Sequence, residues 1–384
     1  MIEILYLDDV HCKVDCDSST AQELSDFFTF EVPGARFMPT VRNKVWDGKI
    51  RLFNAVTRTT YAGLVNYIVD FAKVRNYDCI VESKLASGVS FSNEDVDDLA
   101  QSVGLTLEPR DYQKRAIAHA ISNKRCLLLS PTASGKSLVI YMLARYYPGK
   151  KLIVVPTTSL VHQMASDFSE YGYEVEVQKI TAGATKEITN EITVTTWQSI
   201  YKLQRKWFDQ FSVVIGDEAH LFKAKSLTSI MSKLNNTPYR FGFTGTLDGS
   251  QTHRLVLEGL FGPVERVIHT SELIKQQVLA NLKINICILS HIEKNRAEQS
   301  RAIYKDEINF IVGLESRNKF IINLCNELRG NTLVLYSLVE KHGKELYRLA
   351  ETLDRKVFFV HGGVSGETRD EIRSIVEQED NALI

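Results

Sequence analysis

The stretch Cys126-Leu127-Leu128-Leu129-Ser130-Pro131-Thr132-Ala133-Ser134-Gly135-Lys136-Ser137 decides the fold of this chain. Its first four residues predict a short buried strand, and Leu138, Met142 and Leu143 after it follow a helical pattern. A Gly-Lys-Ser turn between a buried strand and a helix is typical of a phosphate-binding loop, because backbone N–H groups and the helix dipole attract phosphate there. Ser130 stands where the general pattern has glycine, and a chance Gly-Lys-Ser turn is the alternative.

This loop is predicted to hold the phosphates of a nucleotide. Lys136 would neutralise charge on the β- and γ-phosphates, and the Ser137 hydroxyl would bind Mg²⁺. The predicted nucleotide-binding residues of the loop are Thr132, Ser134, Gly135, Lys136 and Ser137.

A pair of carboxylates follows another apolar run some eighty residues later. Asp217-Glu218-Ala219-His220 comes directly after the predicted strand Val213-Val214-Ile215. Ligands of parallel sheets bind at the carboxyl ends of the strands, so these side chains are expected to face the same nucleotide. Asp217 would then bind Mg²⁺, and Glu218 would orient and deprotonate the attacking water. The alternative is a solvated strand end.

Short apolar runs alternate with helical patterns from Arg110 onward, which is typical of a parallel sheet with helices on both faces. Runs of this kind before Pro263 are 126–129, 152–155, 192–195, 213–215 and 241–243, and runs after it are 284–289, 332–336 and 357–360. The last residues, Ala382 to Ile384, read as the start of another strand. The sequence therefore predicts two α/β lobes, of which the second is incomplete.

Length and composition agree with a multidomain globular protein. The chain has 384 residues, 44% of them apolar and 24% charged, and no apolar stretch is long enough to predict a membrane span. Six dispersed cysteines favour reduced thiols over a zinc site or a disulfide framework. The net charge is −1, so a polyanionic partner would have to be held by local basic patches.

Residues 1–82 are predicted to form a small α+β module, joined to the first lobe by an acidic linker over 83–106. Alternating Ile2, Ile4 and Tyr6 indicate a strand, and residues 63–73 have the pattern of a helix. Residues 36–58 contain six basic residues against one acidic residue, a local charge of +5, interleaved with aromatic residues. This pattern favours contact with nucleic acid through Arg42, Lys44, Trp46 and Lys49, although a solvated basic face is an equal alternative from the residues alone.

Taken together, the motifs resemble those of the superfamily-two helicases. Ser130–Ser137 resembles motif I, and Asp217-Glu218-Ala219-His220 resembles motif II, the DEAH box. Other segments follow in the family's order. Arg110-Asp111-Tyr112-Gln113 resembles the adenine-reading element, and Pro156-Thr157-Thr158-Ser159-Leu160 resembles motif Ia. Thr181-Ala182-Gly183 and Thr195-Thr196-Trp197-Gln198 resemble the later motifs that contact the nucleic-acid strand, and Thr244-Gly245-Thr246-Leu247 resembles motif III. The N-terminal module, through Phe37-Met38-Pro39 and Trp46-Asp47-Gly48-Lys49-Ile50, is similar to that of phage recombination helicases.

The resemblance implies two RecA-like lobes, over 107–265 and 266–384, that close around ATP and Mg²⁺. It implies that Arg110 and Gln113 bind adenine and that His220 belongs to the catalytic group. It also implies that Pro156, Thr157, Gly183 and Thr196 contact nucleic acid, and that Thr244 and Thr246 couple the two sites. The expected activity is ATP-dependent unwinding of branched DNA (forks, Holliday junctions and R-loops) in recombination, replication and repair. The expected location is the cytoplasm, that of a host cell if the chain is phage-encoded.

The arginines after Ser337 do not follow the pattern of motif VI, which supplies the arginine finger in this family. We therefore expect a second lobe that is cut short before motifs V and VI, and feeble ATP turnover if the working polypeptide ends at Ile384. Two alternatives remain open: an ATP-switched nucleic-acid-binding protein, and a translocase on double-stranded DNA that does not separate strands. Single-stranded DNA, RNA and RNA–DNA hybrids also remain possible partners.

Overall fold

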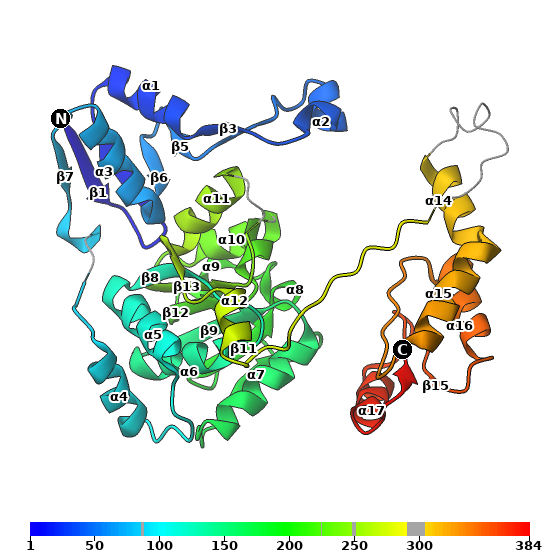
Figure 1. Cartoon of the computed structure of the whole chain (residues 1–384). Helices are drawn as coiled ribbons and strands as arrows, with labels where there is room; N and C mark the ends of the chain where they lie inside the picture. Colours follow the sequence, from blue (N-terminus) through cyan, green and yellow to red (C-terminus); the bar gives the residue numbers. More distant parts are fainter. Residues whose placement is uncertain (86–87, 224, 248–250, 290–303) are drawn as a thin grey trace. The chain divides into compact units, whose positions relative to one another are not determined.

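A computed structural model describes residues 1–85, 88–223, 225–247, 251–289 and 304–384 of the chain. Two compact units are formed, residues 1–281 and residues 282–384 (Figure 1). The first unit contains a small N-terminal sheet and a large parallel sheet. Among the described residues, no helix has both the length and the apolar character needed to cross a bilayer.

The N-terminal module is a five-stranded sheet in the order β5-β6-β2-β1-β7. The strand predicted from Ile2, Ile4 and Tyr6 is confirmed as β1, and the predicted helix is confirmed as α3 with a 3₁₀ turn before it. Asp17 caps α1 by accepting from the N–H groups of Ser19 and Thr20. The elements are β1 (Ile2–Tyr6), β2 (His11–Asp15), α1 (Ser18–Phe27), β5 (Phe53–Asn54), β6 (Thr59–Tyr61), η2 (Ala62–Leu64), α3 (Val65–Val74) and β7 (Cys79–Val81).

An arm leaves this module between α1 and β5. Its base is the antiparallel pair β3 (Thr29–Glu31) and β4 (Lys49–Arg51), and its tip carries the short helices η1 (Ala35–Phe37) and α2 (Pro39–Arg42) (Figure 1). Most side chains at the tip are exposed, and none within α2 is buried. The arm therefore holds its place through its two short strands and not through a core of its own.

The segment between the module and the large sheet is partly packed. It contains η3 (Ser83–Leu85) and α4 (Asn93–Ser102), and Ser92 caps α4 in a capping box with Asp95. Val96 of α4 is fully buried in the core of the large sheet domain. α4 is thus part of the wall of that domain.

Seven parallel strands form the large sheet, in the order β10-β11-β9-β12-β13-β8-β14. All five apolar runs predicted before Pro263 are confirmed as strands of this sheet. The strands are β8 (Arg125–Leu129), β9 (Lys150–Val155), β10 (Gln178–Ile180), β11 (Ile192–Thr196), β12 (Phe211–Gly216), β13 (Tyr239–Thr244) and β14 (Val264–Arg266). Their near-continuous apolar sequences follow from burial on both faces.

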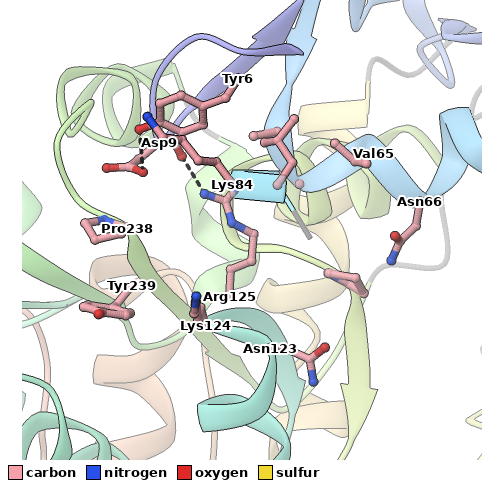
Figure 2. A pocket seen from close by; sticks show the side chains of 14 residues that line it. Tyr6, Asp9, Val65, Asn66, Lys84, Asn123, Lys124, Arg125, Pro238 and Tyr239 are labelled. Atoms are coloured by element: carbon pink, nitrogen blue, oxygen red, sulfur yellow. Dashed lines mark hydrogen bonds between the residues drawn. The ribbon is translucent and has the colours of Figure 1, made fainter. Parts of the chain in front are cut away.

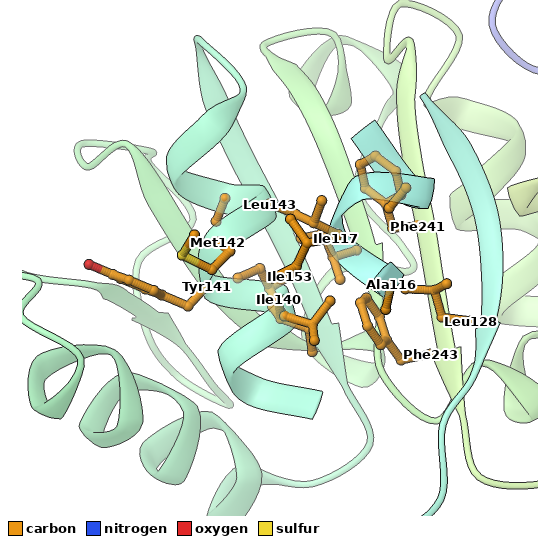
Figure 3. Packing of buried hydrophobic residues seen from close by; sticks show 14 of the residues in the cluster. Ala116, Ile117, Leu128, Ile140, Tyr141, Met142, Leu143, Ile153, Phe241 and Phe243 are labelled. Atoms are coloured by element: carbon orange, nitrogen blue, oxygen red, sulfur yellow. The ribbon is translucent and has the colours of Figure 1, made fainter. Parts of the chain in front are cut away.

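Helices cover both faces of this sheet. On one face α5 and α6 pack over the strands, and Figure 3 shows Ile140 and Leu143 of α6 near Ile117 of α5 and Ile153 of the sheet, with Ala116 of α5 nearer to Leu128. The helices of the domain are α5 (Asp111–Asn123), α6 (Lys136–Tyr146), α7 (Thr158–Glu170), α8 (Trp197–Ile200), α9 (Arg205–Phe208), η4 (Ala219–Lys223), α10 (Lys225–Lys233), α11 (Gln251–Phe261) and α12 (Thr270–Lys275).

The N-terminal module contacts the large sheet domain at backbone distance. A Cβ on Gly63 would lie 2.0 Å from the carbonyl oxygen of Glu258 in α11, so only glycine fits there. The Tyr67 hydroxyl donates to Glu258 Oε2 at 2.6 Å, and the Glu258 side chain is buried. These contacts fix the module on α11.

A second set of contacts joins the two sheets next to a cavity of about 170 Å³. Figure 2 shows Arg125 reaching toward Asp9, whose carbonyl oxygen accepts from Arg125 Nη2 at 2.7 Å. Asn235 Nδ2 donates to Asp8 Oδ2 at 2.8 Å, and the Asp9 N–H donates to the Asn235 carbonyl at 3.0 Å. The junction is therefore polar and hydrogen-bonded as well as closely packed.

Arg240, in the otherwise apolar strand β13, is fully buried. It donates from Nε to the Leu260 carbonyl at 2.8 Å, from Nη1 to the Leu234 carbonyl at 2.9 Å, and from Nη2 to the Met231 carbonyl at 3.0 Å. Burial, with the nearby Arg125, lowers its pKa to about 9, so it stays charged at neutral pH. One side chain thus satisfies carbonyls at the ends of α10 and α11.

Replacing Arg240 by Met should lower the free energy of unfolding by about 3 kcal/mol, because three buried carbonyls would lose their donors. Urea unfolding monitored by circular dichroism measures the loss. Arg205→Met is the control, since its side chain is 58% exposed and its ion pair with Asp209 is long at 3.9 Å; it should change stability by less than about 0.5 kcal/mol. Equal stability of the two variants would contradict the role given to Arg240.

The second unit contains helices around a small parallel sheet. β15 (Lys356–Val357) pairs with β16 (Ala382–Leu383), and residues 332–334 hydrogen-bond along the other side of β16. Its helices are α14 (Tyr304–Gly313), α15 (Glu315–Glu327), the π-helical turn η5 (Val339–Gly343), α16 (Lys344–Ala350) and α17 (Gly366–Glu377).

The prediction of a strand over 284–289 is wrong for this structure. These residues form no strand, and Ile284, Ile286 and Ile288 are at least 75% exposed. Alternation of apolar and polar residues specifies a strand only where a neighbouring strand and a covering layer are present, and among the described residues this segment has neither.

Candidate functional site

Apart from Arg110 and Gln113 at the start of α5, the predicted site residues of the large sheet domain lie at one edge of its sheet. The phosphate loop follows β8, Asp217 follows β12, and Thr244 ends β13; these three strands are neighbours. Pro156 follows β9, Gly183 follows β10, and Thr196 ends β11, which form the other half of the sheet. The carboxyl edge is thereby divided into two adjacent halves, the usual ligand-binding edge of such sheets.

The phosphate loop is shaped by two left-handed residues. Ala133 has φ 63° and Gly135 has φ 73°, a backbone course that lets successive N–H groups form an anion-binding concavity. Ser134 is buried, and its hydroxyl contacts Ser130 Oγ at 2.6 Å and donates to the Pro131 carbonyl at 2.7 Å. Ser134 therefore shapes the loop with its side chain, while Thr132 is exposed. Ser130 supplies a partner to Ser134 that glycine could not.

Gln113 braces this loop from α5. Its Oε1 accepts from the Arg110 N–H at 2.8 Å, and its Nε2 donates to the carbonyls of Ser134 at 3.1 Å and Gly135 at 3.2 Å. Gly135 is favoured by its φ, and a Cβ on residue 135 would lie 2.4 Å from this Nε2 and displace the Gln113 amide. Both ends of the amide are thus engaged by the chain's own backbone. The contacts of Gln113 and Arg110 with adenine stay predictions.

Lys136 meets both carboxylates of the acidic pair. Its Nζ lies 2.8 Å from Glu218 Oε1 and 3.7 Å from Asp217 Oδ1, across 82 residues of sequence from Glu218. All three side chains are largely sheltered, with 14%, 29% and 9% exposed for Lys136, Glu218 and Asp217. The predicted convergence of the Gly-Lys-Ser turn and the distant acidic pair is therefore present.

The acidic pair suits a divalent cation. Asp217 Oδ1 is buried without a hydrogen-bond partner among the described residues, and Lys136 compensates its charge only through a long ion pair of 3.7 Å. Burial raises the pKa of Asp217, Lys136 opposes this, and the adjacent Glu218 adds to it. Carboxylate and hydroxyl oxygens are ligands that Mg²⁺ prefers. The residues present thus fit Mg²⁺ held by Asp217 and Ser137.

Glu218 has φ 49°, a left-handed conformation that costs a residue with a side chain about 1–2 kcal/mol. Such strain is concentrated at functional sites. From this position its Oε2 lies 3.3 Å from His220 Nδ1, and the same nitrogen lies 3.1 Å from Thr244 Oγ1. The Thr244 hydroxyl also donates to the Thr246 carbonyl at 2.8 Å. A series of polar contacts, ion pairs followed by hydrogen bonds, thus runs from Lys136 to the residues predicted to couple the two sites.

Four residues of the sheet domain are predicted to contact nucleic acid, and they differ in how far each is exposed to solvent. Thr157 is exposed and caps α7 by accepting from the Leu160 N–H at 3.4 Å. Gly183, with φ 81°, is in an exposed turn, and Pro156 is half-buried. Thr196 is buried, and its hydroxyl contacts Ser199 Oγ at 3.0 Å, so its contact with nucleic acid stays a prediction.

The arm of the N-terminal module carries the other predicted contacts. Arg42 and Lys44 are exposed at its tip, and no ion pair involves either within the described chain. Lys49 lies 3.9 Å from Glu31, and Trp46 is half-buried with its Nε1 donating to the Lys49 carbonyl at 3.0 Å. The exposed aromatic residue is Phe37, 70% exposed, with the Arg36 guanidinium 4.7 Å from its ring centre. Arg36 and Phe37 therefore join the candidate contacts.

Sequence reasoning missed two contacts around the phosphate loop. Gln113, predicted to bind adenine, also hydrogen-bonds to the backbone of the loop. Tyr171, at the end of α7, contacts the Ser137 hydroxyl at 2.8 Å. Nothing in the local sequence indicates either contact, because both depend on how α5 and α7 pack against the loop.

Comparisons with known proteins agree with these features. Residues 106–249 match the family described as "Type III restriction enzyme, res subunit", and residues 1–82 match the family described as "DNA helicase UvsW, N-terminal". The DNA 3'-5' translocase XPB2 of Sulfurisphaera tokodaii is 29% identical over 52% of this chain and 45% of its own length.

The ATP-dependent DNA helicase uvsW of Enterobacteria phage T4 is 35% identical over an alignment that spans 100% of this chain and 80% of that protein. A crystal structure of T4 UvsW aligns with 100% of this chain and 79% of its own, at 35% identity and a TM-score of 0.64. Another crystal structure of the UvsW helicase from bacteriophage T4 covers 69% of this chain and 99% of its own, at 37% identity and a TM-score of 0.63. With its phosphate loop, acidic pair and N-terminal module in the same order, the chain belongs to the UvsW family of ATP-dependent superfamily-two DNA helicases.

Proposed function

We propose that this chain uses the hydrolysis of Mg²⁺-bound ATP to unwind and remodel branched DNA, such as forks, Holliday junctions and R-loops. The observation that carries the proposal is the contact of Lys136 with Asp217 and Glu218 at the carboxyl edge of the sheet. The loops after β9, β10 and β11 form the other half of the same edge. The proposal extends to every site residue named above, including the arm.

The chemistry follows from the placement of the side chains. When bound, Mg²⁺ would neutralise charge on the β- and γ-phosphates. Ser137 and Asp217 would hold it, and Lys136 would leave Glu218 to contact the γ-phosphate. Glu218 would then be free of its ion pair with Lys136, still next to His220, and able to orient a water and accept the proton of that water. Thr132 and the loop N–H groups would bind the remaining phosphate oxygens.

The path from ATP to DNA is the chain Glu218–His220–Thr244–Thr246. Because Lys136 and His220 both contact the Glu218 carboxylate, a change at the γ-phosphate alters the hydrogen bond that His220 makes with Thr244. The loop after β13 also lies against the phosphate loop, since the Ser130 N–H donates to the Thr244 carbonyl at 2.8 Å. Thr244 and Thr246 are therefore suited to transmit the state of the nucleotide.

The first unit offers two separate surfaces to DNA. One is the half-edge with Pro156, Thr157, Gly183 and Thr196, and the other is the tip of the arm. Such surfaces bind phosphate without reading base sequence. Two separate protein surfaces can contact two duplex branches of one DNA junction. This possibility supports the proposal of a branched substrate.

Unwinding of a forked duplex by the full-length protein should be compared with unwinding of a linear duplex of the same sequence. We expect ATP-dependent unwinding that is faster on the fork. Equal rates on both duplexes would remove the branch preference and leave a general helicase. Strand separation that does not need ATP would overturn the proposal itself.

A translocase on double-stranded DNA is the second candidate, because half of this chain resembles the protein described as a DNA 3'-5' translocase. Displacement of the third strand from a DNA triplex without separation of the duplex would identify this activity. Displacement together with duplex separation would favour the helicase.

Replacing Arg42 by Gln and Lys44 by Asn should weaken DNA binding and flatten its salt dependence. Asn is chosen because residue 44 has φ 55°, which Asn tolerates. Two lost phosphate contacts would reduce the slope of log K against log[salt] by about 1.8 on duplex DNA. Fluorescence anisotropy at several salt concentrations measures it.

The control removes the same charge elsewhere in the module, by replacing exposed Lys13 and Lys73 with Gln. It should leave the slope within error of the unaltered protein. The same slope for both double variants would show that the arm tip is only a solvated basic surface.

A further inference from the structure

The Ser137 hydroxyl has a protein partner that the proposed function does not use. Ser137 Oγ lies 2.8 Å from the Tyr171 hydroxyl, and the two residues are 34 apart in sequence. Both groups are half-buried, so the contact is partly sheltered from water. Ser137 is the residue that would bind Mg²⁺, which makes the direction of this hydrogen bond important.

The position of Tyr171 is fixed by several contacts. Its ring packs against Tyr141, with ring centres 5.5 Å apart in a T-shaped arrangement, and Tyr141 is four residues from Ser137 on the same face of α6. The Tyr171 carbonyl accepts from the Thr106 N–H at 3.4 Å. Next to it Gly172 has φ 96°, and a Cβ there would lie 2.8 Å from the Gly104 carbonyl oxygen. The hydroxyl is thus held at Ser137 by α6, α7 and the segment before α5.

We propose that Tyr171 is a positioning residue for the metal, whose hydroxyl oxygen accepts the Ser137 proton and so turns a lone pair of Ser137 Oγ toward Mg²⁺. The inference rests on the proposed function of the same site.

The hydrogen-bonding capacity of serine supports this direction. Its hydroxyl has one proton and two lone pairs, and a metal can take only a lone pair. The proton must then point to an acceptor; Tyr171 Oη lies 2.8 Å away, and the Asp167 carboxylate is a second group within hydrogen-bonding reach of the Ser137 side chain. Outer partners that orient metal ligands in this way commonly contribute 10- to 100-fold to metal affinity.

Tyr171→Phe tests the inference, because it removes the hydroxyl and keeps the ring against Tyr141. Tyr173→Phe is a matched control: Tyr173 packs on the same Tyr141 ring, and its buried hydroxyl has no hydrogen-bond partner among the described residues. The affinity of each full-length variant for a fluorescent ADP analogue is measured in excess Mg²⁺ and in EDTA.

For Tyr171→Phe we expect about a 10-fold loss of affinity in Mg²⁺ and little change in EDTA. Tyr173→Phe should match the unaltered protein in both conditions. In a Ser137→Ala background, Tyr171→Phe should have no further effect, since the hydroxyl that it orients is already gone.

Three outcomes would overturn the inference. The first is equal nucleotide affinity of Tyr171→Phe and the unaltered protein, and the second is tighter Mg²⁺-dependent binding by Tyr171→Phe. The third is an equal loss of affinity in Mg²⁺ and in EDTA, which would mean that Tyr171 only supports the loop. Failure of the unaltered protein to bind nucleotide at all would instead overturn the proposed function, so the two failures are distinguishable.

Discussion

Glu218→Gln is expected to lower kcat for ATP hydrolysis by about 10²–10⁴-fold while leaving ATP affinity nearly unchanged. The amide keeps the shape of the side chain but cannot accept a proton from water. Metal binding should survive, because the negative charge of Glu218 is one of the causes that, after burial, raise the pKa of Asp217. Steady-state hydrolysis and equilibrium binding of the same fluorescent nucleotide separate the two effects.

Glu174→Gln is the control for this variant, since Glu174 is exposed and distant in sequence from the acidic pair. It should hydrolyse ATP at the rate of the unaltered protein. Normal ATP turnover by Glu218→Gln would exclude Glu218 as the base. Its contacts with Lys136 and His220 would then have only a structural role.

Lys136→Ala should lower both nucleotide affinity and hydrolysis, and ATP-dependent unwinding should be lost with them. Removing one positioned cation from such a site costs on the order of 10²–10³ in rate. Here the loss is compounded, because Lys136 is also the cation next to the two carboxylates, at 2.8 and 3.7 Å. Without it, Asp217 and Glu218 face each other uncompensated, which disfavours the ionised Asp217 that the metal needs.

DNA binding by Lys136→Ala should stay within about twofold of the unaltered protein, since the arm and the loops after β9, β10 and β11 are not altered. Lys179→Ala, which removes an exposed charge from β10, is the control for hydrolysis. ATP-dependent unwinding by Lys136→Ala would contradict the assignment of the phosphate loop.

Much of the candidate nucleotide site, which consists of the phosphate loop and the acidic pair, could be predicted from the sequence because each of these parts directly follows a buried strand. Lys136 follows β8 through a short loop, and Asp217 follows β12 with no loop at all, so strand order alone brings them to one edge. Such placement needs only local patterns and the rule that parallel strands end together.

Other features depend on packing between segments far apart in sequence. The occupied amide of Gln113, the left-handed Glu218 and the Tyr171–Ser137 contact have no local signature. Arg240 is different, because a single arginine within the apolar run Tyr239–Thr244 is itself a signal of a buried cation that caps carbonyls. The failed strand over 284–289 shows the converse: an alternating pattern is not sufficient where no neighbouring strand covers it.

The close approach of Gly63 to α11 has a mechanical consequence. A module attached through flexible loops would act as a tether, and its arm could follow DNA independently of the sheet edge. Here backbone contacts backbone, and α11 lies directly after the segment that ends β13. The module and the large sheet domain should therefore move as one piece, and we expect any rotation of the large sheet during the ATP cycle to carry the base of the arm with it.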